Sequence, residues 1–428
     1  MKKVFIMAAA LMASLPFAFA QEAQKVSVKP YGFVRNYLTF DSRKTYTVVG
    51  GEYNMIPFDI DTVDGVDLNN VPSMQLQALT SRFGVNITGP EIGRWASSGK
   101  LEADFGGFGS NNTVLRLRLA YLKLKAEDGL WNAELLMGQD WHPLSGSIMP
   151  EVLGMASGAP FRPHSRTPQM RASMYIGSLG YTAALMWQLQ YMNNGPKDAA
   201  DPTSVASINF AHNTLLPEVF LGLNFKQGGW YVQAGADLQM LRPRTHAVVG
   251  GVTKKVDDIV ESITPTLYAQ YVEGDWSVKF RTLLAQNTSH LNQMVGYAVT
   301  GVNEDGSWNY SPMNATISYL NIAYGKEFRC NLFLGYMKNL GAKENLYDFG
   351  GSTYRIYMKG GEEFTHLNSI WRVAPSVSYN VKAFNIGLEY EVTACTYGDL
   401  GEKGQVLIND RLRNVVNHRL CALVKYNF

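Results

Sequence analysis

The sequence predicts an all-β chain that closes into a transmembrane antiparallel β-barrel of about 16 strands. Three observations predict this fold. The chain ends on an aromatic residue after an amphipathic strand, apolar and polar residues alternate along most of its length, and tight turns alternate with long polar loops. Outer-membrane barrels have short periplasmic turns and long extracellular loops, whereas a soluble sandwich has no reason to place every long loop at one end.

The last strand, 411–428, carries the clearest alternation. Apolar side chains recur at every second position, and polar residues such as Arg419 and Lys425 lie between them. A period of two is that of a strand with one face toward lipid and the other toward water. Tyr426 and Phe428 are similar to the C-terminal signal of outer-membrane barrels, so we expect the barrel-assembly machinery to read them.

The first twenty residues are predicted to be a secretory signal peptide. Lys2 and Lys3 form its basic start, an apolar run follows, and a small-residue cleavage site lies at 18–20. The mature chain, 21–428, is then a single barrel domain with 36 basic and 36 acidic residues. A chain near neutrality gives no reason to expect a nucleic-acid partner.

About sixteen strand-like segments follow one another along the mature chain. In one of them, Leu115, Leu117 and Leu119 alternate with Arg116 and Arg118. The alternation of turns and loops places both ends of the barrel on the short-turn side. The predicted strands are 29–40, 73–88, 99–106, 113–126, 130–140, 166–176, 181–191, 217–226, 230–241, 261–271, 276–285, 315–324, 328–337, 366–379, 383–396 and 411–428.

Two prolines and several loops complete this prediction. Pro265 and Pro375 fall inside predicted strands, so we expect a bulge or a one-residue error at each, because proline cannot donate to the ladder. The three cysteines form no disulfide framework, and the seven histidines contain no pair at metal-ligand spacing, so no cofactor is expected. The long loops are predicted at 41–72, 141–165, 192–216, 242–260, 286–314, 338–365 and 397–410, and a short one at 107–112.

Positions opposite the apolar faces are expected to line the lumen. Basic residues outnumber acidic ones there, and a ladder of arginines would draw anions along the wall, because a guanidinium stays charged and offers paired donors. The alternative, kept open here, is that these arginines pair with nearby carboxylates and make the lumen rigid. The predicted pore-lining residues are Arg35, Arg82, Glu102, Asp104, Arg116, Arg118, Arg171, Arg281, Arg372 and Arg419.

The stretch 141–165 would be the third extracellular loop. We expect it to fold inward and narrow the pore, because its length and its prolines suit a fixed fold. Its polar candidates for this constriction are His142, Glu151, Arg162 and His164. The alternative is an ordinary loop on the outer surface.

Four motifs lie in order in the first third of the chain. They are SRFG at 81–84, GKLEADF at 99–105, LRLRLAY at 115–121 and LMGQDW at 136–141. In this order they resemble the DcaP-like trimeric porin family of bacterial outer membranes. The resemblance implies a homotrimer of barrels and the passage of small, often negatively charged, solutes. Some members carry a helical segment before the barrel, and here only 21–28 is available for one.

The sequence therefore favours a porin through which small hydrophilic solutes diffuse passively, with a mild preference for anions. The rival is a plugged or adhesive barrel that acts through its extracellular loops. A plug would need an extra segment inside the barrel, and 21–28 is too short to be one. A third possibility is an uptake channel for a lipophilic solute. No enzyme is expected, because the outward-facing His418 has no visible serine partner and no G-x-S-x-G motif is present.

Overall fold

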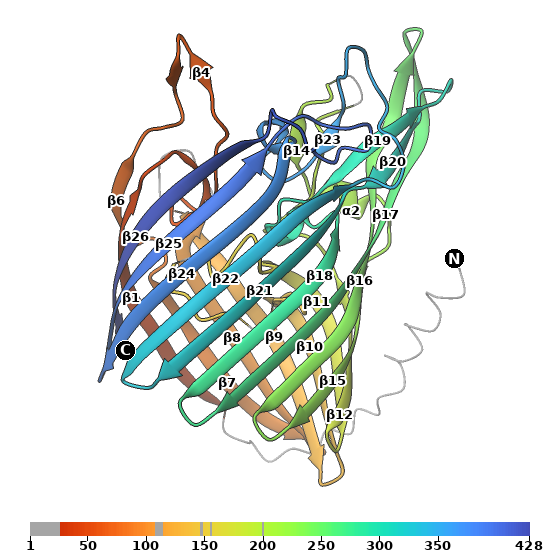
Figure 1. Ribbon diagram of the computed structural model, residues 1–428. Helices are drawn as coiled ribbons and strands as arrows, with labels where there is room; N and C mark the ends of the chain where they lie inside the picture. The colour runs from red at the N-terminus through yellow and green to blue at the C-terminus, as the bar shows by residue number, and fades with distance from the viewer. Residues whose placement is uncertain (1–25, 108–113, 146–148, 155, 199–200) are drawn as a thin grey trace.

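The computed structural model describes residues 26–107, 114–145, 149–154, 156–198 and 201–428. The predicted signal peptide and most of the predicted short loop at 107–112 lie outside this part of the chain. The described residues form a closed antiparallel barrel, which confirms the predicted fold class (Figure 1). Its strands are β1 (Ser27–Asp41), β6 (Ser73–Gln77), β7 (Arg82–Ile92), β8 (Trp95–Gly107), β9 (Val114–Asp128), β10 (Trp131–Trp141), β11 (Arg166–Ile176), β12 (Leu179–Met186), β15 (Glu218–Gln227), β16 (Trp230–Val249), β17 (Val252–Glu273), β18 (Trp276–Gln286), β21 (Asn314–Gly325), β22 (Phe328–Gly341), β24 (Leu367–Val381), β25 (Phe384–Tyr397) and β26 (Arg413–Asn427).

The barrel wall has sixteen positions, because β6 and β7 share one of them. Both strands pair with β1, β6 along 37–41 and β7 along 27–33, so together they are the predicted strand at 73–88 with a break at 78–81. The wall closes where β1 pairs with β26. At this seam, the Phe428 amide donates to the Gly32 carbonyl (3.0 Å), and the Gly32 amide donates back to the Phe428 carbonyl (3.1 Å).

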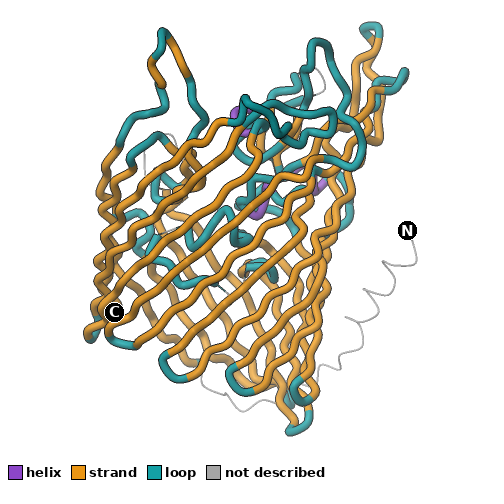
Figure 2. The backbone as a smooth tube through the Cα atoms, in the orientation of Figure 1, coloured by secondary structure: helices purple, strands orange, loops and turns teal. Residues whose placement is uncertain are grey.

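Short turns lie at one end of the barrel and long loops at the other, as predicted (Figures 1 and 2). Several turns use glycine at positive φ, including Gly129, Gly177, Gly228 and Gly274. Positive φ at such a turn matches the right-handed twist of the two strands that it joins, and glycine adopts it readily. The C-terminus lies at the turn end of the wall (Figure 1).

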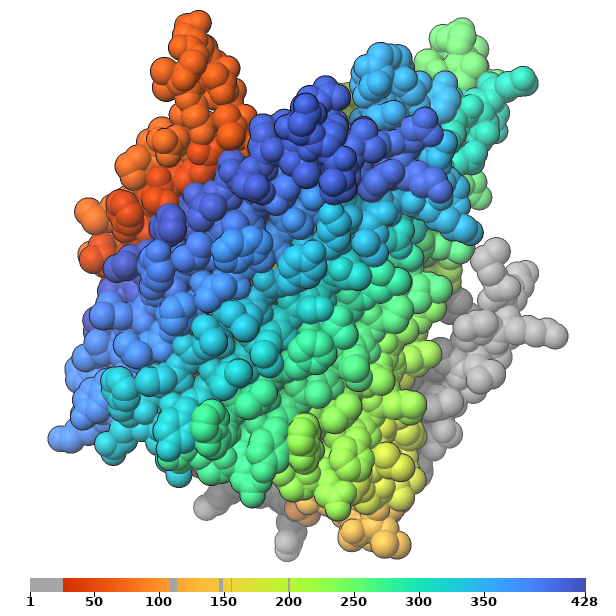
Figure 3. Space-filling model, viewed as in Figure 1, coloured from red at the N-terminus to blue at the C-terminus, as the bar shows by residue number. Residues whose placement is uncertain are grey.

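The two faces of the wall differ in polarity. Along β26, Val416, Leu420, Val424 and Tyr426 are exposed on the outside, whereas Asn417 and its inward neighbours are buried. The outer surface, seen in Figure 3, is a continuous wall of adjacent strands. A closed barrel pairs the backbone groups of its strands internally and presents an apolar face to lipid, so it is suited to span a membrane.

One predicted loop is a hairpin. The stretch 242–260 was predicted as a loop, but β16 and β17 continue through it and rise above the rest of the wall (Figure 1). Two Arg–Asp pairs, Arg242–Asp257 and Arg244–Asp258, lie across the hairpin. The Arg244 Nη1 atom lies 3.2 Å from the Asp258 Oδ2 atom, and Gly250 and Gly251 form the turn. A strand above the membrane needs no apolar face, so its sequence lacks the alternation that marks the other strands.

The two prolines do not cause the expected bulges. Pro265 pairs with Ala236 of β16 without a register shift, and the pairing of β17 with β18 begins only at Thr266. Pro375 pairs with Leu332 of β22, while the pairing of β24 with β25 is interrupted beside it. Each proline therefore lies where its strand is not paired with one of its two neighbours. No partner is lost there through the missing N–H group, and the register of the strand does not change.

The long loops contain several smaller elements. The described residues include three short helices, α2 (Asn209–His212), η1 (Ser289–Leu291) and η2 (Glu362–Phe364). None of the helices in this part of the chain has the length and apolar character needed to cross a membrane. The remaining strands are β2 (Thr45–Val48), β3 (Tyr53–Pro57), β4 (Thr62–Val63), β5 (Val66–Asp67), β13 (Asn194–Pro196), β14 (Ser204–Ala206), β19 (Tyr297–Val302), β20 (Trp308–Pro312) and β23 (Ile356–Tyr357).

Parts of three long loops lie inside the loop end of the barrel (Figure 2). They are the first loop (42–72), the third loop (142–165) and the sixth loop (287–313). All five residues of β3 are buried, as are residues 287–299 of the sixth loop. Loops of the wall therefore occupy part of the lumen, which the argument against a plug, made only for 21–28, did not consider. Loops that leave the wall fold back into it, because their apolar residues find a core there.

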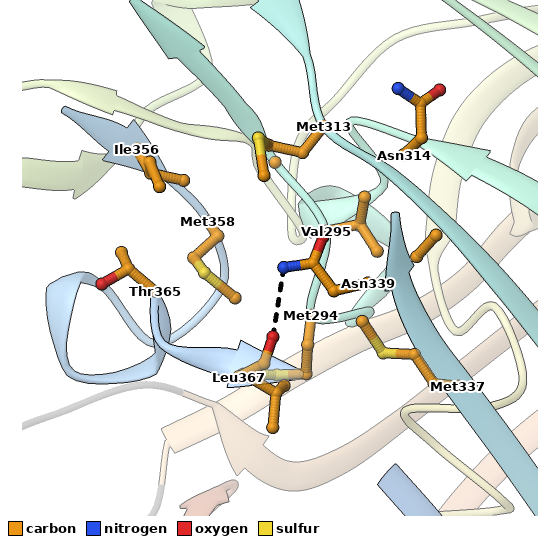
Figure 4. Close-up of a pocket in the computed structure, with 12 residues that line it drawn as sticks. Met294, Val295, Met313, Asn314, Met337, Asn339, Ile356, Met358, Thr365 and Leu367 are labelled. Carbon is orange, nitrogen blue, oxygen red and sulfur yellow. Dashed lines mark hydrogen bonds between the residues drawn. The ribbon is translucent and has the colours of Figure 1, made fainter. Parts of the chain in front are cut away.

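A methionine-rich contact shows how tightly these loops pack. Met294 of the sixth loop, Met313, Met337 of β22 and Met358 converge beside Asn339, whose Nδ2 donates to the Leu367 carbonyl (3.1 Å; Figure 4). The space left between them is about 10 Å³, which is at the lower limit for one water molecule. Flexible methionines fill irregular gaps well, so this part of the lumen is packed like a protein core.

Candidate functional site

The inward charges of β8 and β9 form a tightly paired group. The Asp104 carboxylate accepts from Arg116 Nε (2.9 Å) and Nη2 (2.8 Å) and from Arg118 Nη1 (2.7 Å). Arg118 Nε also donates to Glu102 Oε1 (2.8 Å), and all four side chains are buried. For Arg116 and Arg118, the arrangement is thus the carboxylate pairing that the sequence left open as an alternative to a free ladder.

The third loop brings His164 and Arg162 against this group. Arg162 Nη1 donates to His164 Nδ1 (2.9 Å), so the ring proton is on Nε2, which faces the Tyr53 hydroxyl of β3. Burial, together with the positive charges of Arg162 and Arg166, lowers the pKa of His164 well below its ordinary value of 6.5. His164 is therefore a neutral part of the site at pH 7.

Trp141 is the centre of what we name the arginine cluster, which comprises Arg116, Arg118, Arg162 and Arg166. The guanidinium carbons of the last three lie 5.9, 5.2 and 4.9 Å from centroids of its rings. Arg166 Nη2 donates to the Tyr191 hydroxyl (2.8 Å). Among the described residues, Arg162 Nε and Nη2 and Arg166 Nε and Nη1 have no hydrogen-bond partner. Buried donors of this kind favour an anionic oxygen.

The tip of the third loop is fixed to the opposite wall. Glu151 Oε2 accepts from Arg329 Nε of β22 (2.6 Å), and Glu151 Oε1 lies 3.3 Å from Lys279 Nζ of β18. The Glu389 carboxylate of β25 accepts from the amides of residues 153 and 154, at 2.8 and 2.9 Å. Because the loop starts at β10 and is anchored at β22 and β25, it crosses the lumen.

A cavity of about 790 Å³ lies on the turn side of the cluster. Its wall carries five basic and four acidic side chains, most of which face each other in pairs. Arg171 Nη2 lies 2.8 Å from Asp140 Oδ2, and Lys123 Nζ lies 3.0 Å from Glu134 Oε2. The charged residues that line it are Arg82, Lys100, Glu102, Lys123, Glu134, Asp140, Glu151, Arg171 and Lys279.

The other predicted residues lie apart from the cluster. Arg35 Nε donates to Thr80 Oγ1 (3.1 Å), and Arg419 Nη1 lies 3.1 Å from Asp41 Oδ2. Arg281 Nη1 donates to the Leu144 carbonyl of the third loop (2.6 Å). Arg372 donates to Thr393 Oγ1 and to backbone carbonyls of the first and third loops. His142 is also separate, with its Nε2 3.0 Å from Glu218 Oε1.

Solved structures with the same fold are bacterial outer-membrane proteins. The outer membrane channel DcaP of Acinetobacter baumannii is 16% identical, with 96% of this chain and all of that chain covered and a TM-score of 0.60. An anion-selective porin from Comamonas acidovorans is 10% identical, with 94% and 100% covered and a TM-score of 0.50. The trimer form of OmpT of Vibrio cholerae is 13% identical, with 95% and 100% covered and a TM-score of 0.50. No protein-family model and no curated protein matches the sequence.

The chain has the fold of an outer-membrane porin. The resemblance to the DcaP-like family that the motifs suggested is thus confirmed at the level of fold.

Sequence reasoning missed three residues of this porin-like site. Tyr53 lies on a hairpin of the first loop, where no periodicity indicates which way a side chain points. Tyr191 was placed at the end of a predicted strand, but β12 already ends at Met186, and Tyr191 is buried. Arg166 begins β11 and has the parity of the lipid face, yet it is fully buried. Alternation could not have found it, because strand ends leave the regular geometry.

Proposed function

We propose that the protein is a porin through which small hydrophilic solutes pass by diffusion, with a preference for anions. The solute would cross the 790 Å³ cavity and the arginine cluster, and the third loop would form the constriction. The observation that carries this proposal is the charge of the cluster. Four guanidiniums there face only two carboxylates, Glu102 and Asp104, and N–H groups of Arg162 and Arg166 have no partner among the described residues.

The excess charge matters because the cluster is buried. At an effective dielectric constant of about 20, two unit charges 4 Å apart interact by roughly 4 kcal/mol. A cation that approaches the cluster is repelled on this scale, while an anion gains charge-assisted hydrogen bonds. The cavity wall, by contrast, is nearly balanced in charge. We therefore assign the anion selectivity mainly to Arg162 and Arg166, and less to Arg116 and Arg118, whose charges are paired with carboxylates.

The remaining predicted residues have supporting roles in this proposal. Arg82 and Arg171 line the cavity, and Arg35, Arg281, Arg372 and Arg419 fix the wall and the loops around it. Within the third loop, Glu151 anchors the tip, His164 orients Arg162, and His142 holds the start of the loop. No cofactor takes part in such passage, and the protein would not act as an enzyme.

The second candidate is a plugged barrel that acts through its extracellular loops. The observation that favours it is the packing of the first, third and sixth loops in the lumen. In that case the protein would be folded and stable in the membrane but would carry no current.

Ion selectivity in a planar bilayer separates the two candidates. We expect stepwise conductance with a reversal potential on the anion side under a salt gradient. The double variant Arg162→Gln, Arg166→Gln should move this potential toward zero or to the cation side. The barrel should stay folded because, within the described part of the chain, neither arginine forms a salt bridge whose loss would leave a carboxylate buried alone. Arg94→Gln, at an exposed turn residue, is the matched control and should change nothing. Current without anion preference, or an unchanged potential in the double variant, would refute the role of the cluster. A folded protein with no current would favour the plugged barrel.

We also propose that the mature protein is a homotrimer inserted in outer-membrane lipid by the barrel-assembly machinery, after removal of a signal peptide at 1–20. One structural neighbour is described as a trimer form. The apolar outer face offers lipid and a second copy the same kind of surface. Native mass spectrometry in detergent would give the number of copies, and the mass of one chain would give the cleavage site.

A further inference from the structure

Four side chains that can bind a metal converge inside the barrel, away from the arginine cluster. They are His142 at the start of the third loop, Glu218 of β15, Asp237 of β16 and His290 of the sixth loop. One ligand atom from each lies within 4.8 Å of all the others. All four side chains are more than nine-tenths buried. Because they come from four separate segments, their spacing in the sequence gives no sign of a site.

The distances suit a small coordination sphere. Glu218 Oε1 lies 3.0 Å from His142 Nε2 and 2.9 Å from His290 Nε2, and His142 Nε2 lies 3.7 Å from Asp237 Oδ1. Ligand atoms of a tetrahedral site with bonds near 2.05 Å are about 3.3 Å apart. The two distances to Glu218 also suit hydrogen bonds, so spacing alone does not distinguish a metal from protons.

Asp237 gives a second observation that points to a metal. Its Oδ1 atom is buried and has no hydrogen-bond partner among the described residues. It points into the cluster, since its distance to His142 Nε2 is only slightly longer than a hydrogen bond. As metal ligands, two carboxylates and two neutral imidazoles carry a charge of −2. One divalent cation would cancel this charge and supply a partner for Asp237 Oδ1.

The surroundings resemble those of a protein metal site. Leu144, Met186, Phe220 and Leu291 form a buried apolar group beside the four ligands. In the next layer, Gln239 Nε2 lies 3.3 Å from both ring nitrogens of His290, and Asn287 Nδ2 donates to Gln239 Oε1 (3.0 Å). An apolar shell and a fixed layer of polar groups orient the ligands and exclude water.

We propose that His142, Glu218, Asp237 and His290 form a binding site for a divalent transition metal of the Zn²⁺ class. Two imidazole nitrogens and two carboxylate oxygens form a donor set that suits this borderline cation. The metal would tie the third and sixth loops to β15 and β16. Its role would be to fix the loops that fill the lumen, whether or not solutes pass.

Binding requires one local rearrangement at His142. Its Nδ1 atom now accepts from the Leu144 amide (3.1 Å), so a neutral ring carries its proton on Nε2. Coordination through Nε2 moves that proton to Nδ1, where it needs an acceptor. A turn of the peptide between residues 143 and 144 would present the Pro143 carbonyl, the usual partner of a ligating histidine.

The test is Zn²⁺ binding to the whole folded barrel in detergent, after removal of metal with a chelator. We expect one Zn²⁺ per chain by calorimetry, and a tetrahedral absorption spectrum with Co²⁺. Asp237→Asn and His290→Ala should each weaken binding by about 100-fold or more. His246→Ala is the control, because His246 is an exposed histidine on the β16–β17 hairpin, and it should bind like the wild type.

Three results would overturn the proposal. They are no stoichiometric binding by the stripped protein, equal binding by Asp237→Asn and His246→Ala, and an octahedral Co²⁺ spectrum unaffected by either variant. Heat-modifiability on gels confirms that each variant is folded before it is measured. Since the readout is metal binding and not current, it is independent of the proposed porin function. Zn²⁺ should also slow hydrogen exchange in the sixth loop of the wild type and not in Asp237→Asn.

Discussion

The buried pair of Asp104 and Arg116 allows a direct estimate of what charge contributes to this lumen. Asp104 is fully buried and accepts two bonds from Arg116, one from Arg118 and one from the Gly106 amide. Asp104→Asn keeps the shape of the side chain and removes its charge. Breaking a buried pair from one side costs about 3–5 kcal/mol, because the other charge stays buried without compensation. Arg118 keeps Glu102, so we expect a loss of about 3 kcal/mol.

Unfolding in denaturant, followed by tryptophan fluorescence in lipid vesicles, measures this loss. The matched control is Asp128→Asn, since Asp128 and Arg94 form a pair that is 63% exposed on both sides. Exposed pairs contribute less than about 1 kcal/mol, so this variant should resemble the wild type. The double variant Asp104→Asn, Arg116→Gln removes both charges and should recover part of the loss. If Asp104→Asn and Asp128→Asn are equally stable, the Arg116 charge is compensated by something other than Asp104 and the reasoning fails.

Two further predictions concern the third loop and the closing strand. Burial and nearby positive charge lower the pKa of His164, so below about pH 6.5 the unfolded chain takes up a proton that the folded chain does not. The free energy of unfolding should therefore decrease as the pH drops through this value, and His164→Asn should make this decrease smaller. The measurement is the difference in denaturant midpoint between about pH 7.5 and 5.5. Equal differences in the wild type and the variant would contradict the prediction. Deletion of Phe428 removes both backbone bonds to Gly32 at the barrel seam and the terminal aromatic residue, so we expect little heat-modifiable protein in the outer membrane. Normal amounts of folded protein after the deletion would show that neither is needed for assembly.

The wall of the barrel was predictable from sequence because one physical constraint acts at every position. Lipid outside and polar groups inside force a period of two, and this parity is the basis on which the ten lumen residues, from Arg35 to Arg419, were predicted. Parity gives the side of a residue but neither its height nor its neighbour. The pairing of Asp104 with Arg116 depends on the register of β8 and β9, which the sequence does not state.

The contents of the lumen could not be predicted, because no period governs a loop. Tyr53 and His164 meet across a gap of 111 residues, and His142 and His290 both reach Glu218 from different loops. Such contacts depend on where each loop re-enters the barrel. Loops that leave the wall also return to the lumen, whereas the argument against a plug considered only 21–28 as an extra segment.

The inward arginines divide into two groups by the partners they find. In one group, Arg372 gives its donors to Thr393 and to carbonyls of the first and third loops, and Arg281 donates to the Leu144 carbonyl. In the other group, Arg82 and Arg171 line the cavity. The first group therefore positions loops, and the second faces solvent. Replacing Arg372 should loosen the third loop before it alters the charge that a solute meets, so selectivity and loop position can be changed separately. The barrel thus uses one residue type both to hold loops inside the lumen and to line the cavity beside them.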